Sequence, residues 1–128
     1  MKITYPAVFH HEDGAYWAEF PDLPGCQTYG ETAEETLKSA QEALEGYSVT
    51  LLETGKKLPV ASPIENIETD HSSFTSFVQA DISAYLNKSK AIKKTLTIPE
   101  WLNAQAIENG INFSQVLQDA LIKQLHIS

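Results

Sequence analysis

The chain has 128 residues, of which 42% are hydrophobic and 20% are charged, and its formal net charge is −8 at pH 7. This composition is typical of a packed soluble protein and excludes wholesale disorder. No apolar run approaches the ~18 to 20 residues that span a bilayer, and the N-terminus lacks the apolar core of a signal peptide, so we expect a cytoplasmic protein without membrane contact. The single cysteine, Cys26, has no partner for an internal disulfide, which agrees with a reducing compartment.

The charge is unevenly distributed along the chain. Residues 1–87 contain 14 acidic residues and 4 lysines, whereas residues 88–128 contain 3 acidic residues and 5 lysines. A strongly acidic body suits a basic partner, and a mildly basic tail suits phosphate groups. On charge alone, the alternative that the acidic residues only keep the body in solution stays open.

The first part of the chain predicts a three-stranded antiparallel meander. Hydrophobic and polar residues alternate in the first strand, and Pro6 places that strand at an edge or at a bulge. Asp13-Gly14 is typical of a hairpin turn, and the proline-rich residues 21–25 predict a rigid loop. The predicted strands are residues 3–9, 16–20 and 26–29.

A helix is predicted to begin after Thr32, where Glu35 completes a capping box. Glu34 and Glu35 lie near the positive end of the helix dipole, and Gly55 ends the helix as a C-terminal cap. Apolar residues recur at spacings of three and four, which directs one face of the helix toward the sheet. This stripe consists of Ala33, Leu37, Ala40, Leu44, Tyr47 and Leu51.

Residues 56–69 contain two prolines and predict a connector. From Phe77 the period-two alternation returns, which predicts a fourth strand that is longer than the others. Its apolar face consists of Val78, Ala80, Ile82, Ala84 and Leu86. These elements predict an α+β layer in which one helix covers one face of an antiparallel sheet.

A polar break at residues 87–90 marks the expected boundary between two domains, 1–87 and 88–128. In the second domain, residues 93–98 alternate as a short strand. Pro99 suits the first position of a helix that stops at Asn109-Gly110. That helix carries Leu102, Ala106 and Ile107.

A second helix of this domain is predicted after Asn112, which forms a variant capping box with Gln115. Its broad apolar stripe consists of Phe113, Val116, Leu117, Ala120, Leu121 and Leu125. A unit of about 38 residues buries such faces poorly by itself, because chains below ~40 residues usually need a metal, disulfides or a partner. A second copy is the simplest partner: two strands pair antiparallel as a ribbon, and four helices close a shared core beneath it.

The order of strand, proline, helix, Asn-Gly and capped helix over about residues 91–127 resembles the ribbon-helix-helix repressors. Alternation then points Leu96 and Ile98 inward, and the opposite side of the ribbon fits the DNA major groove. The resemblance also implies that the start of the second helix binds a phosphate. The DNA-binding candidates are Lys93, Thr95, Thr97, Asn112 and Ser114. The alternative, in which the lysines only protect an edge strand and Asn112 is a plain cap, stays open.

The segment FPDLPGC at residues 20–26, followed by TYGET at 28–32 and by Glu34-Glu35, closely resembles the fingerprint of the HicB antitoxin family. The likeness is close over about residues 3–55. It implies a partial RNase H-like sheet and helix that neutralises a small basic RNA-cleaving toxin, HicA, by direct binding and represses its own operon. The C-terminal unit is similar to the family branch that carries a ribbon-helix-helix tail.

The candidates for the toxin interface are acidic and aromatic residues ahead of and within this motif: Glu12, Asp13, Tyr16, Trp17, Glu19 and Asp22. Two-metal hydrolysis needs converging carboxylates, and nothing spaces these acids for a shared ion. His10 and His11 are adjacent in a strand and therefore face opposite sides, which disfavours a zinc site. We therefore expect no enzymatic activity, no catalytic residue, no metal and no cofactor.

Three functions compete at this point. The first is an antitoxin and autorepressor that binds a HicA-like toxin and operator DNA as a homodimer. The second is a ribbon-helix-helix regulator whose N-terminal domain senses a small molecule, and the third is a nuclease. The sequence specifies neither the operator nor the individual toxin contacts.

Overall fold

The computed structural model describes residues 1–88 and 90–125, except for the side chains of residues 87 and 88. The chain divides into two units, Met1–Lys88 and Ser89–Ser128. The polar break expected at residues 87–90 therefore lies partly outside the described residues.

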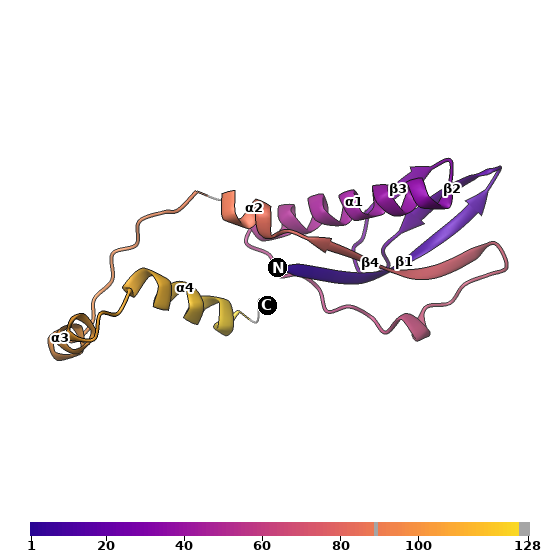
Figure 1. Ribbon diagram of the computed structural model, residues 1–128. Coiled ribbons are helices and arrows are strands. Elements are labelled where there is room, and N and C mark those ends of the chain that lie inside the picture. Colours follow the sequence, from indigo (N-terminus) through magenta and orange to yellow (C-terminus); the bar gives the residue numbers. More distant parts are fainter. Residues whose placement is uncertain (89, 126–128) are drawn as a thin grey trace. The chain divides into compact units, whose positions relative to one another are not determined.

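The first unit is built on a four-stranded antiparallel sheet with the strand order β3-β2-β1-β4 (Figure 1). The expected meander is present, and the hairpin turn has positive φ angles at Asp13 (51°) and Gly14 (78°), as a type I′ turn requires. The strands are β1 (Lys2–Glu12), β2 (Ala15–Glu19), β3 (Gln27–Gly30) and β4 (Ser73–Asp81).

The position predicted for β1 from Pro6 was wrong, because β1 lies in the middle of the sheet and pairs with both β2 and β4. The pairing with β2 begins at Val8, however, so Pro6 has a strand neighbour only on the β4 side. The missing N–H of Pro6 is therefore tolerated at a locally open edge of a central strand.

The fourth strand was predicted too far along the chain and was not the longest. It ends at Asp81, and α2 (Ser83–Lys88) follows where Ala84 and Leu86 were expected to continue the strand. The pairing partner runs out at this point, since Lys2 is the first residue of β1 and lies opposite Asp81. Hydrogen bonds from the hydroxyl and the backbone N–H of Ser83 lower the pKa of Asp81 to about 2, so an ionised carboxylate holds the start of α2.

Helix α1 (Ala33–Glu53) covers one face of the sheet, and its N-cap Thr32 accepts a hydrogen bond from the Glu35 N–H as expected. The predicted stripe is rotated relative to the buried face. Leu37 is 39% exposed, whereas Thr36 and Ser48 are fully buried. The reason is a close approach to β3: a Cβ on Gly30 would lie 2.4 Å from the Thr36 Oγ1, so the helix turns a small residue toward the strand.

The core of the first unit lies between α1 and the sheet. Its residues include Tyr5, Phe9, Ala18, Leu44 and Val78, all of which are buried. The connector after α1 begins against this core, since Leu58 packs on it and the Tyr5 hydroxyl donates to the Pro59 carbonyl. It continues through the short 3-10 helix η1 (Ile64–Asn66), which contacts β4. Pro6 and Val8 are also buried.

The second unit contains α3 (Glu100–Glu108) and α4 (Phe113–Gln124). Pro99 occupies the N-cap position of α3, one residue before the predicted place, and Gly110 follows the helix with a φ of 65°. The Asn112 side chain accepts a hydrogen bond from the Gln115 N–H at 3.0 Å, which confirms the predicted cap. Residues 93–98 form no strand in the single chain, where they have no neighbour to pair with.

None of the described residues of the second unit is buried. Its exposed large apolar side chains include Leu96, Ile98, Leu102, Phe113, Val116, Leu121 and Leu125. Two capped helices without a core of their own leave most of their apolar surface in water, which is unfavourable by roughly 25 cal/mol for each Å². No helix among the described residues of the two units is long and apolar enough to cross a membrane.

A substitution at Ser48 tests the packing of α1. Its Oγ is the buried side-chain oxygen that lacks a hydrogen-bond partner among the described residues. We expect Ser48→Ala to raise the free energy of unfolding of the first unit by about 1 kcal/mol, because it removes an unsatisfied hydroxyl and favours the helix. Chemical denaturation measures this change. Ser39→Ala, on the same helix, controls for helix propensity, and equal effects of the two variants would contradict the interpretation.

Candidate functional site

The face of the sheet away from α1, called here the open face, follows from the strand register. Residues paired directly across antiparallel strands point to the same side, and Phe9 belongs to the core, so its neighbour His10 points away from α1. His10 pairs with Trp17, and Trp17 pairs with Tyr29. These side chains form a row across three strands near the β1–β2 turn, and Tyr29 is 70% exposed.

The row is held together by specific contacts. The rings of His10 and Trp17 are stacked, with centroids 4.0 Å apart and an angle of 13° between their planes. The His10 Nε2 lies 2.9 Å from the Glu19 Oε2, on the neighbouring position of the same face. The indole of Trp17 is therefore oriented by an imidazole that is itself held by a carboxylate.

The hairpin end of the sheet also differs from the rest of the first unit in its charge. Residues 3–37 contain seven acidic residues and no lysine or arginine. The lysines of the first unit are Lys2 at the start of β1, Lys38 on α1, Lys56 and Lys57 after α1, and Lys88 at the end of α2. The part of the sheet formed by the β1–β2 hairpin and β3 thus carries acidic and aromatic side chains and, within residues 3–37, no lysine or arginine.

The structure brings together only part of the predicted interface set. Glu12, Trp17 and Glu19 share the open face, and Asp13 lies in the adjoining turn. Tyr16 points to the opposite side, where it stacks on His11 with a centroid distance of 4.3 Å. The prediction did not include His10 and Tyr29, although strand alternation from Trp17 identifies both once the register is known.

Asp22 has a structural contact that the sequence did not reveal. Its carboxylate accepts hydrogen bonds from the Ser62 backbone N–H at 2.9 Å and from the Ser62 hydroxyl at 2.5 Å. The Tyr5 hydroxyl donates to the Pro59 carbonyl at 2.5 Å. Burial is the main cause that raises the pKa of Tyr5, and the negative charge of Asp22 adds to it. Asp22 and Tyr5 therefore fasten the connector to the sheet.

The DNA-binding candidates of the second unit are all exposed. Lys93, Thr95 and Thr97 lie in the extended segment before α3. Ser114 is in the first turn of α4, and the Asn112 side-chain oxygen is already used as the helix cap. The structure of the single chain does not bring the two groups into one site.

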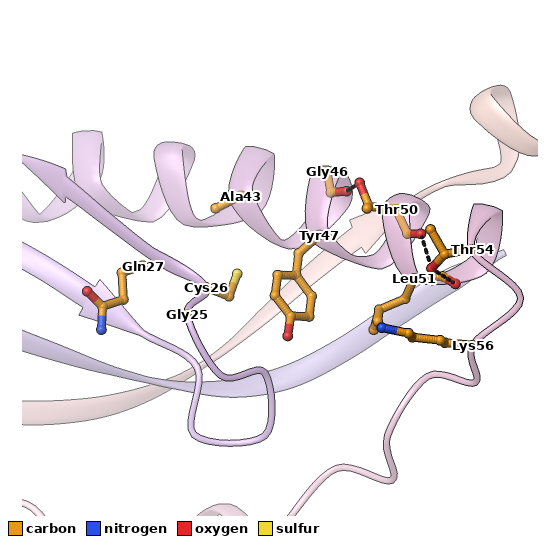
Figure 2. A pocket seen from close by; sticks show the side chains of 10 residues that line it. All are labelled: Gly25, Cys26, Gln27, Ala43, Gly46, Tyr47, Thr50, Leu51, Thr54 and Lys56. Atoms are coloured by element: carbon orange, nitrogen blue, oxygen red, sulfur yellow. Dashed lines mark hydrogen bonds between the residues drawn. The ribbon is translucent and has the colours of Figure 1, made fainter.

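A groove of about 470 Å³ lies between α1 and the loop before β3 (Figure 2). Its hydroxyl groups are used internally, because the Tyr47 hydroxyl donates to the Pro24 carbonyl and the Thr50 and Thr54 hydroxyls donate to carbonyls of α1. Burial raises the pKa of the Cys26 thiol to about 11, which keeps it protonated near neutral pH. Beside these groups, the polar side chains that line the groove are Gln27 and Lys56.

Within residues 1–88 and 90–125, no group of three His, Cys, Asp or Glu side chains lies close enough together to hold a metal ion. His10 and His11 face opposite sides of the sheet, as the alternation predicted.

Comparison with known proteins identifies the family. The sequence matches the model of the HicB-like antitoxin of bacterial toxin-antitoxin systems over residues 5–123. A chain of a toxin-antitoxin complex from Streptococcus pneumoniae is 36% identical, with a TM-score of 0.62 over 97% of this chain and 99% of that chain. A chain of a HicA3 and HicB3 toxin-antitoxin complex is 25% identical, with a TM-score of 0.52 over 62% of this chain and 99% of that chain. Antitoxin HicB 1 of Photorhabdus laumondii is 38% identical over 64 residues, which are 49% of this chain and 41% of that relative.

The four-stranded α+β unit carries an acidic, aromatic face, which suits the binding of a basic partner. The chain belongs to the HicB-like antitoxin family of bacterial toxin-antitoxin systems, since the match runs through both units. Its family therefore makes it a non-enzymatic neutraliser, and the resemblance noted from residues 20–35 is confirmed at that level.

A substitution at Asp22 tests its contact with the connector. We expect Asp22→Ala to lower the free energy of unfolding by about 1 to 2 kcal/mol, because both Ser62 donors lose a charged acceptor. Hydrogen exchange at the Ser62 amide should become faster. Glu68→Ala removes the same charge from the connector without a hydrogen bond of this kind. Equal stability of the two variants would contradict a fastening role for Asp22.

Proposed function

We propose that this chain neutralises a HicA-like RNA-cleaving toxin by direct binding and represses its own operon as a ribbon-helix-helix homodimer on operator DNA. Toxin binding is assigned to residues 1–87, with a partial RNase H-like fold, and dimerisation and DNA binding to residues 88–128. Family membership supports the first activity, and a relative of this chain occurs in a HicA3 and HicB3 complex.

The toxin-binding half of the proposal rests on charge and on the open face. An acidic surface accelerates encounter with a basic protein and disfavours nucleic acid. The seven acidic residues within residues 3–37, without a lysine or arginine, supply such a surface beside the exposed ring of Tyr29 and the half-buried ring of Trp17. Both features suit recognition of a basic protein.

One observation carries the dimeric half: the second unit forms two helices but has no buried residue among those described. Apolar side chains spaced along α4 at positions such as Phe113, Val116 and Leu121 need a covering surface. A second copy supplies an identical surface with two-fold symmetry, and pairing of residues 93–98 across the axis satisfies both strands.

The DNA-binding role follows from alternation in the paired segment. Leu96 and Ile98, which are 59% and 46% exposed in the single chain, turn into the dimer core. Lys93, Thr95 and Thr97 then line the outer face of the ribbon, which fits the major groove. The N–H groups at the start of α4, beside Ser114, suit a phosphate.

The two competing functions gain no specific support. Small-molecule sensing calls for a pocket with a few converging polar groups, and the groove along α1 uses its hydroxyls internally. A nuclease calls for clustered carboxylates, which residues 1–88 and 90–125 do not contain.

Substitutions in residues 93–98 test the ribbon. Thr95→Ala and Thr97→Ala should leave the dimer intact and weaken operator binding by roughly 1 to 3 kcal/mol for each lost base contact. Leu96→Asp should dissolve the dimer and abolish DNA binding, because it places an unpaired charge in the core. Operator affinity and oligomer mass measure both effects.

The same variants test which side chains of residues 93–98 point into the dimer core. A dimer that tolerates Leu96→Asp but fails with Thr95→Ala would mean that the register is inverted. Operator binding equal to that of the parent in all variants would remove the ribbon from DNA recognition.

Salt dependence tests the charge argument for toxin capture. Raising ionic strength should slow association of toxin much more than it speeds dissociation, because screening acts on long-range attraction. Stopped-flow or surface-based kinetics across salt concentrations give both rates. An association rate that does not respond to salt would contradict electrostatic steering while leaving the antitoxin assignment intact.

A further inference from the structure

The acidic and aromatic residues at the hairpin end of the open face form one ordered cluster. The cluster consists of His10, Glu12, Trp17, Glu19 and Tyr29. It draws on three adjacent strands of a sheet, so its members are fixed relative to one another by the backbone pairing.

The contacts within the cluster leave part of its aromatic and carboxylate surface exposed to solvent. The His10 ring stacks on Trp17, and its Nε2 engages Glu19 through the Oε2 atom. The Glu19 side chain is still 36% exposed. Tyr29, paired directly with Trp17, is the most exposed aromatic residue of the sheet at 70%. Aromatic surface and carboxylate oxygens therefore face solvent together.

This combination selects a cation. An arginine or lysine head group is attracted to the face of an indole or phenol ring within about 6 Å of its centroid, and a neighbouring carboxylate adds a charge-assisted hydrogen bond. No lysine or arginine of residues 3–37 competes for the cluster, and the described remainder of the unit places its lysines at the start of β1, on α1 and after α1. An anionic occupant would be repelled by the Glu19 carboxylate, and a purely apolar occupant would remove its exposed part from water without a new partner.

We propose that this cluster is the docking point for an arginine or lysine side chain of the basic toxin, held over Trp17 and Tyr29 and paired with Glu19, while Glu12 at the turn end of the same face adds negative charge. The identity of the partner rests on the proposed function. His10 acts as a positioning residue that orients the indole and does not itself carry the contact. Tyr16 and Asp22 lie outside the docking point.

The experiment uses the full chain and a small basic HicA-like toxin, produced in a catalytically inactive form. Trp17→Leu and Tyr29→Ala should each raise the Kd about tenfold, chiefly through faster dissociation. Glu19→Gln should slow association and weaken its salt dependence. Tyr16→Leu, on the next residue of β2 but the opposite face, and Glu42→Gln on α1 should stay within about threefold of the parent.

Fluorescence reports on the site directly. The chain has two tryptophans, Trp17 and Trp101, so a Trp101→Phe background leaves Trp17 as the single indole reporter. Toxin should shift its emission and protect it from acrylamide quenching. Since Tyr29 is largely exposed and Glu19→Gln keeps the side-chain shape, these two variants preserve the test if Trp17→Leu fails to fold.

The outcomes separate the two levels of inference. A parent chain that does not bind the toxin overturns both the proposed function and the docking point. A parent that binds, with Tyr29→Ala and Glu19→Gln binding equally well, overturns the docking point alone. Self-association of the chain that is lost in Tyr29→Ala, with toxin affinity unchanged, would assign the face to a second copy and overturn it as well.

Discussion

The pairing of β1 with strands on both sides is the constraint on which the first unit depends. Because β1 is central, each of its side chains belongs either to the core under α1 or to the open face. The strand register then determines which side chains of β2, β3 and β4 lie on the same face. Phe9 packs in the core, and His10 therefore stands beside Trp17 outside it. The side chains of the open face are therefore fixed by the same register that forms the core. A shift of one residue in the strand pairing would move core side chains to the open face and the open-face side chains into the core.

The predicted strand of the second unit also needs a paired strand, and the single chain does not supply one. Residues 93–98 alternate as a strand and remain unpaired in the single chain, and the helices that follow have no described buried residue. Local signals still form α3 and α4, because the caps at Pro99 and Asn112 act within a single turn. In the proposed dimer the stability of this unit depends on protomer concentration, so operator occupancy responds to the amount of chain present.

The sequence predicted the features that arise locally. The Asp13-Gly14 turn and the caps at Thr32 and Asn112 each depend on residues within a few positions, and all three are present. The errors concern long-range pairing. The strand predicted to continue through Leu86 ends at Asp81 because β1 begins at Lys2, and α1 buries Thr36 instead of Leu37 because Gly30 of β3 admits a close approach. The roles of His10 and Tyr29 stayed hidden for the same reason, since alternation alone does not specify which side receives the helix.

The opposite charges of the two halves place a physical demand on the segment between them. A body with 14 acidic residues and 4 lysines repels the phosphates that the tail is proposed to approach. Salt limits the range of this repulsion to a Debye length of about 8 Å at physiological ionic strength. Four residues separate α2 from the predicted ribbon, and a segment of this length can span roughly 13 Å, which exceeds the Debye length. A link of this length is compatible with the proposal that one chain carries a surface for a basic protein and another for DNA.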